Sequence, residues 1–124
     1  MIAGILSLLT IHFIADFVLQ DRHTAENKSK SIAVLIKHLL PYLFFLAIFA
    51  WIFNKSMWFP ILNCVAHGVQ DWVMWGYFYG LTLKLRKIEF NSEYKYWKDY
   101  YFYLTVGLDQ FLHLALLLIT FILL

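Results

Sequence analysis

Three pairs of ionisable residues lie inside hydrophobic stretches of this sequence, each a histidine and an aspartate four positions apart. They are His12 with Asp16, His67 with Asp71, and Asp109 with His113. On an α-helix this spacing places both side chains on one face, about 6 Å apart along the axis. Imidazole and carboxylate groups are ligands for divalent transition metals, and two of them on one helix can bind the same ion. The pattern therefore indicates a metal site.

The third pair has the opposite order along the chain. A helix that crosses a membrane in the opposite direction needs this order to place its histidine and its aspartate at the same depths as the other two pairs. The order of the residues is thus the first indication that these helices cross a bilayer.

The composition is that of a membrane protein. Of the 124 residues, 62% are hydrophobic, 20% are aromatic and 15% are charged, whereas soluble domains are about half apolar. The length allows one domain, residues 1–124. The one cysteine, Cys64, excludes an internal disulfide and a Cys-x-x-Cys metal motif. A net charge of +2 is too small for a nucleic-acid-binding surface, so we expect no nucleic-acid partner.

Four hydrophobic stretches predict an all-α membrane four-helix bundle. The predicted helices cover about residues 2–19, 32–53, 57–81 and 101–124. Each is long enough to cross a hydrocarbon core of about 30 Å. The first and third helices each carry a His-x-x-x-Asp sequence, and the helix after each carries a histidine, His38 or His113. The bundle could therefore consist of two parallel helical-hairpin repeats.

The basic residues predict the topology. Nine of the ten lie in or beside the first and third loops, and the other side has Lys55 alone. Short cytoplasmic loops are rich in lysine and arginine. We therefore expect a protein of the inner (cytoplasmic) membrane with both termini outside and with residues 20–31 and 82–100 in the cytoplasm. The third loop is also rich in tyrosine and tryptophan, which predicts that it lies along the membrane interface.

With this topology the three helices present their histidines toward the outside and their carboxylates deeper, and the histidine of the second helix can join them. An aspartate at the centre of a membrane helix costs roughly 2.5 to 3.5 kcal/mol on insertion scales, so these groups should face one another inside the bundle. The predicted metal site has seven residues: His12, Asp16, His38, His67, Asp71, Asp109 and His113.

We expect a divalent metal, with zinc as the first choice and manganese or iron as alternatives. Seven candidate ligands exceed the four of a closed zinc site, so one supported metal or a two-metal centre would fit. An open coordination position could activate water, which suggests hydrolysis of a lipid or a phosphoester. The alternatives are haem between histidines, a transporter of ions, protons or small molecules, and a scaffold with a structural polar core. The small-xxx-small pair Gly76 and Gly80 allows close helix packing, including in a homo-oligomer.

The sequence resembles a family of short bacterial and phage-encoded integral membrane proteins catalogued as a domain of unknown function. The family pattern is H-x-x-x-D-F-x-L-Q, E-N-K, a histidine, H-x-x-x-D and D-Q-x-x-H. Here these motifs are residues 12–20, 26–28, His38, residues 67–71 and residues 109–113. The resemblance covers essentially the whole chain and implies a multi-pass membrane protein, but it brings no established activity.

A looser similarity links the first helix to helical zinc-dependent phospholipases C and related nucleases, which carry H-x-x-x-D-x-x-Q-P-x-H. Here Gln20 and His23 each lie one residue late and the proline is absent. The shared part is therefore the pair His12 and Asp16.

Overall fold

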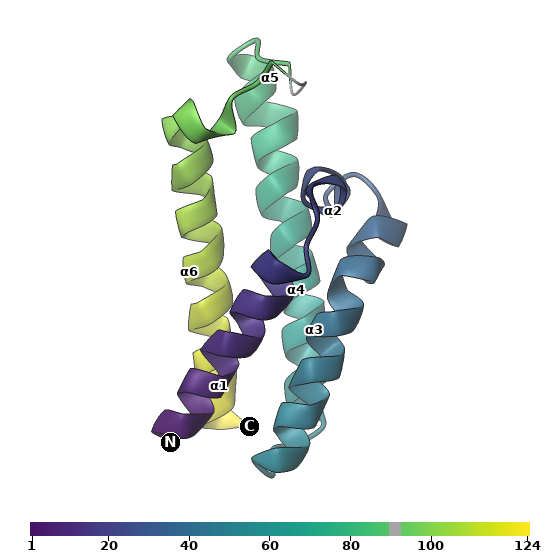
Figure 1. Cartoon of the computed structure of the whole chain (residues 1–124), viewed down its shortest axis with the longest axis vertical. Coiled ribbons are helices and arrows are strands. Elements are labelled where there is room, and N and C mark those ends of the chain that lie inside the picture. The colour runs from purple at the N-terminus through teal and green to yellow at the C-terminus, as the bar shows by residue number, and fades with distance from the viewer. Residues whose placement is uncertain (90–92) are drawn as a thin grey trace.

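A computed structural model describes residues 1–89 and 93–124, and these residues form helices and connecting loops without any strand (Figure 1). The all-α class predicted from the sequence is confirmed. The longer helical segments are α1 (Ile2–Phe13), α3 (Ile32–Ile52), α4 (Trp58–Tyr77) and α6 (Tyr100–Leu123). The shorter ones are η1 (Ile14–Val18), α2 (Arg22–Asn27), η2 (Phe78–Thr82), α5 (Leu83–Leu85) and η3 (Tyr96–Lys98).

Figure 1 shows α1, α3, α4 and α6 running along the long axis, with both termini at the same end. Helices α1 and α4 run in one direction, and α3 and α6 run in the other. Helix α4 is central, because it packs against both α3 and α6, while α1 packs mainly against α3. The chain therefore forms two hairpins side by side, as the predicted repeat requires.

Three of the helices begin at a polar residue that caps the first turn. The side chain of Asp21 accepts a hydrogen bond from the Thr24 backbone N–H, at 2.7 Å, at the start of α2. Ser31 caps α3 and Asp99 caps α6 in the same way. Such caps satisfy backbone donors that have no partner within the helix. The caps at Ser31 and Asp99 fix where α3 and α6 begin, and so where the connections before these two helices end.

The connection after the first helix does not extend away from the bundle. Helix α2 folds back beside α3, and Lys28, directly after it, reaches Asp71 of α4 (Figure 1). The segment η1 has the wide π-helical turn, in which the Leu19 N–H bonds the Ile14 carbonyl at 2.9 Å. Such turns are often found at functional sites. This one carries Asp16.

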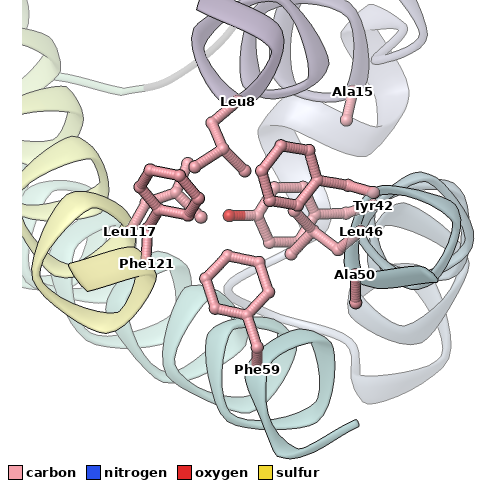
Figure 2. Close-up of a cluster of buried hydrophobic side chains, with 9 residues drawn as sticks. Leu8, Ala15, Tyr42, Leu46, Ala50, Phe59, Leu117 and Phe121 are labelled. Atoms are coloured by element: carbon pink, nitrogen blue, oxygen red, sulfur yellow. The ribbon is translucent and has the colours of Figure 1, made fainter. Parts of the chain in front are cut away.

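The interior at the end that holds both termini is filled by apolar side chains from all four long helices. Leu8, Leu46, Phe59 and Leu117 are all 0% exposed. Figure 2 shows these side chains converging, together with Ala15, Tyr42, Ala50 and Phe121. The close approach of α1 and α6 depends on Gly4, because a Cβ atom there would lie 2.6 Å from the Phe121 ring.

Two helices in the described part of the chain are long and apolar enough to cross a membrane, α3 and α6. The segment Ile2–Val18 is apolar but shorter. Helix α4 buries several polar side chains, including Asn63, His67 and Asp71, which lowers its hydropathy. The four predicted membrane crossings therefore stay a prediction.

The predicted interfacial segment 82–100 is described apart from residues 90–92, which lie outside the described residues. Arg86 donates two hydrogen bonds to Asp99, at 3.0 and 3.1 Å, and the Tyr94 hydroxyl donates a third. Burial opposes ionisation of Asp99, but these hydrogen bonds outweigh it and hold the pKa of its carboxyl below its usual range. The segment is thus joined to the start of α6 by an ionic contact.

Candidate metal centre

Four buried side chains from three segments converge in the interior beside α2. They are Asp16 of η1, His38 of α3, and His67 and Asp71 of α4. None is more than 5% exposed. The approach of α3 to α4 at this level uses Gly68, where an added Cβ would lie 2.7 Å from the end of the Leu39 side chain. These buried aspartate and histidine groups could hold a metal ion.

Five of the six distances between the four ligand atoms are nearly equal. The His38 Nε2 atom lies 3.2 Å from Asp16 Oδ1, 3.2 Å from Asp71 Oδ2 and 3.2 Å from His67 Nε2. The His67 Nε2 atom lies 3.4 and 3.2 Å from the same two oxygens. A regular tetrahedron of zinc ligands at about 2.0–2.1 Å has edges of about 3.3–3.4 Å. The five distances are therefore those that a tetrahedral metal site would require.

Hydrogen bonds alone do not satisfy these four atoms. Each imidazole Nε2 can donate one hydrogen, yet each faces two carboxylate oxygens and the other nitrogen. Asp16 Oδ1 and Asp71 Oδ2 have no hydrogen-bond partner among the described residues. Buried polar atoms are normally paired, and a cation between the four would pair all of them.

A second group shares Asp71 with the first and adds Asp109 and His113 of α6. The Nδ1 atom of His113 lies 2.7 Å from the Asp109 backbone carbonyl, to which it can donate. This bond leaves Nε2 as the free nitrogen, 3.9 Å from Asp71 Oδ1. A backbone bond to one ring nitrogen is the usual way to orient a metal-binding histidine. The Trp75 indole N–H donates to Asp109 at 3.4 Å.

His12 lies beside the centre but outside both of these groups. Its Nε2 atom is 2.7 Å from Gln110 Oε1, and the Gln110 amide donates to Asp16 Oδ2 at 2.7 Å. Because the glutamine oxygen can only accept, the histidine is the donor in this pair. His12 thus acts on Asp16 through Gln110.

The structure therefore brings all seven predicted residues into one buried cluster and gives them different places in it. Four form the tetrahedral group, two more form the second group with Asp71, and His12 holds Asp16 indirectly. The ring of Tyr42 lies 4.4 Å from that of His67, between centroids, and so joins the apolar cluster of Figure 2 to the polar one.

Lys28 is the site residue that the pair spacing does not reveal. Its Nζ atom lies 2.8 Å from Asp71 Oδ1 and 3.8 Å from Asp16 Oδ1, and its side chain is 3% exposed. Burial alone would lower the pKa of this ammonium, but Asp71 and Asp16 raise it above its usual range. The sequence signal that could have found it is its place in the segment Glu26-Asn27-Lys28, one of the motifs of the resemblance.

A cavity of about 430 Å³ reaches the cluster from the side of α2. Its inner end is formed by Asp16, Lys28, Asp109 and Gln110. Most of its wall is aromatic or aliphatic, and the residues of that wall include Phe17, Trp75, Tyr79, Phe102 and Val106. Asp16 is the member of the tetrahedral group that lines the cavity.

Residues 5–124 match the model of the family described as "Protein of unknown function (DUF3307)". The chain belongs to this family. The match confirms the predicted membership in a family of unknown function, and it carries no activity. Neither a curated protein nor a solved structure matches the chain. The function of this DUF3307 member must therefore be argued from the geometry of its site.

Proposed function

We propose that this chain is an integral membrane, metal-dependent hydrolase that acts on a lipid or a phosphoester. The observation that carries the proposal is the tetrahedral arrangement of ligand atoms from Asp16, His38, His67 and Asp71 in a buried position. Two imidazoles and two carboxylates favour zinc, with manganese or iron as alternatives.

The membrane part of the proposal is supported by where polar and apolar side chains lie. The ionisable cluster is buried, whereas many of the exposed side chains on the long helices are large and apolar, for example Leu40, Phe44, Val69 and Phe111. Contiguous exposed apolar surface of this kind suits a lipid environment. We place the protein in the inner membrane with both termini outside and residues 20–31 and 82–100 in the cytoplasm. A C-terminal reporter that is active only in the cytoplasm should therefore be silent.

Asp16, His38, His67 and Asp71 would hold a divalent metal, and a zinc ion with an open position would supply a water of lowered pKa, about 7. Water and substrate would approach past Asp16, because this carboxylate lines the cavity. Asp109 also lines it and keeps Oδ1 without a hydrogen-bond partner, so we assign it as the general base.

Two observations argue against particular alternatives. The interior toward the termini is filled by fully buried apolar side chains such as Leu8 and Leu117, which argues against an open channel through the bundle. The His67 and His113 rings lie 4.0 Å apart between centroids, which leaves no space for a haem between them.

Metal analysis of the purified full-length protein tests the proposal against a structural polar core. We expect stoichiometric metal in the wild type and its loss in His67→Ala. The control is His23→Ala, because His23 is exposed and lies outside the cluster. A wild-type protein without stoichiometric metal would overturn the proposal. Metal-loaded protein that hydrolyses neither lipids nor soluble phosphoesters would favour the non-enzymatic alternatives.

A further inference from the structure

Lys28 lies at the junction between the cavity and the candidate metal centre. Its ammonium is buried, yet Lys28 also forms part of the cavity wall. A lysine ammonium carries three N–H donors. One close carboxylate, Asp71 at 2.8 Å, and a more distant one, Asp16 at 3.8 Å, leave donor capacity for a group inside the cavity. Such a group must be an acceptor and is best an anion.

The charges at the inner end balance when a divalent metal is present. Three carboxylates, those of Asp16, Asp71 and Asp109, face each other here. The two charges of the metal and the one of Lys28 offset these three, since metal-binding histidines are neutral. A divalent metal would add two positive charges beside the Lys28 ammonium. An anionic ligand should therefore bind more tightly to the metal-loaded protein than to the metal-free protein.

The other acidic residues along the cavity are already engaged. Asp21 accepts the capping hydrogen bond of α2 from the Thr24 backbone. Glu26 accepts a hydrogen bond from Arg22 at 2.5 Å. Arg22 offsets the charge of Glu26, and Asp21 is exposed to solvent, so Lys28 is the cation of the cavity lining that lies closest to the candidate metal centre.

The cavity wall suits an apolar group next to the anionic one. Trp75 and Phe102 line it, and their rings lie 5.7 Å apart between centroids. The volume, about 430 Å³, falls within the roughly 300–1,000 Å³ of typical ligand pockets. A ligand with an anionic end and an apolar body would match both parts of the cavity.

We propose that the cavity binds the phosphate group of an amphiphilic phosphoester, with a phosphate oxygen at the Lys28 ammonium beside the metal and the apolar part against the aromatic wall. This inference rests on the proposed function, because the charge balance needs the metal. The phosphate could belong to a lipid headgroup or to a soluble phosphoester, and the aromatic wall favours the lipid.

The test uses the full-length protein in detergent, loaded with Co²⁺ and freed of excess metal, because the visible absorption of Co²⁺ reports its coordination. Three ligands are titrated: inorganic phosphate, glycerol phosphate and dihexanoyl phosphatidic acid. We expect all three to change the absorption, and the lipid to bind about tenfold or more tightly than glycerol phosphate, because its acyl groups bury methylenes. Equal affinities for glycerol phosphate and phosphatidic acid would indicate a soluble phosphoester and would overturn the proposal of an amphiphilic ligand.

The variant Lys28→Gln should weaken phosphatidic acid binding about tenfold or more, the usual effect of losing a hydrogen bond to a charged group. Lys28→Arg should restore most of the affinity, and Lys37→Gln, an exposed lysine of α3, is the matched control. The cobalt spectrum before titration shows whether each variant has kept its fold. Unchanged affinity in a folded Lys28→Gln variant would overturn the role of Lys28.

The wild-type titration keeps the inference falsifiable even if Lys28→Gln does not fold. Cobalt-loaded wild type that responds to none of the three phosphates would overturn the inference while the metal site stands. Preferential binding of dodecyltrimethylammonium would also overturn it, because a cation would then be the preferred ligand. A wild type that binds no cobalt would overturn both the inference and the proposed function.

Discussion

The two ends of the bundle are built from the same four long helices but hold them together by different means. Toward the termini the interior is apolar, and its polar pair, Asn63 and Thr120, is satisfied internally at 2.8 and 3.1 Å. Toward α2 the interior holds the histidine, aspartate and lysine side chains of the candidate metal centre. Close packing of apolar side chains stabilises the end near the termini, whereas the stability of the end near α2 depends on the balance of buried charges. The apolar end can therefore serve as a scaffold that positions the polar end.

The largest effect should come from Asp71→Asn at the polar end. This change removes a metal ligand and leaves the Lys28 ammonium without its closest carboxylate. Removing one partner of a buried ion pair costs about 3–5 kcal/mol. We expect loss of bound metal together with a large loss of stability, measured by metal analysis and by denaturant unfolding in detergent. Glu26→Gln, which removes a carboxylate of α2, should change neither, and normal metal content in Asp71→Asn would contradict the assignment.

Leu117→Ala at the apolar end should separate stability from metal binding. Leu117 is 0% exposed, and truncating a buried leucine costs about 2–5 kcal/mol through the cavity it leaves. We expect a lower free energy of unfolding with unchanged metal stoichiometry. If metal were lost in parallel while the protein remained folded, the two ends would not be independent.

Gln110→Ala tests the contact that supports Asp16. The amide joins His12 to Asp16 through two bonds of 2.7 Å. Removing such a supporting partner typically lowers metal affinity about 10–100-fold, with a smaller effect on the fold. Competition with a chelator of known affinity measures the change. Gln70→Ala, at a glutamine of α4, gives a comparison, and an equal loss of metal affinity in both variants would contradict the supporting role of Gln110.

Asp99→Asn should have the smallest effect, because Asp99 lies outside both ends of the bundle. Its carboxyl has a lowered pKa in the folded chain, so its contribution to stability is present above its unfolded pKa of about 3.9 and is lost as the pH falls through the folded value. At neutral pH the variant should lose at most about 1 kcal/mol through the ionic contact with Arg86, because asparagine can still cap α6. The difference in unfolding free energy between wild type and variant should shrink as the pH falls toward 3. A constant difference would contradict the ionic contact.

The spacing of the His/Asp pairs carried most of the information about the cluster. Because residues four apart share a helix face and buried carboxylates need partners, the sequence alone leads to a common site for His12, Asp71 and the other five residues. The fold class followed from the hydrophobic stretches by the same kind of argument, and the structure confirms it.

The sequence does not show which of the seven residues form the four-ligand group and which support it through another side chain. This arrangement depends on the wide turn of η1, which sets the direction of Asp16, and on an interhelical glutamine, Gln110. The His/Asp spacing does not identify Lys28, for a different reason. In a polar connection with several basic residues, a lysine reads as a surface charge until the fold-back of α2 is known.

The contact between Lys28 and Asp71 also has a consequence for biogenesis. The lysine belongs to the first hairpin and its closest carboxylate to the second, so the ion pair forms only after the third long helix has been synthesised. A chain that ends before α4 retains Lys28 with Asp16 as its nearby carboxylate, at 3.8 Å, and lacks the closer one at 2.8 Å. The buried position of the lysine is therefore completed by the second hairpin, so the order of synthesis delays the strongest contact of this residue until α4 has been made.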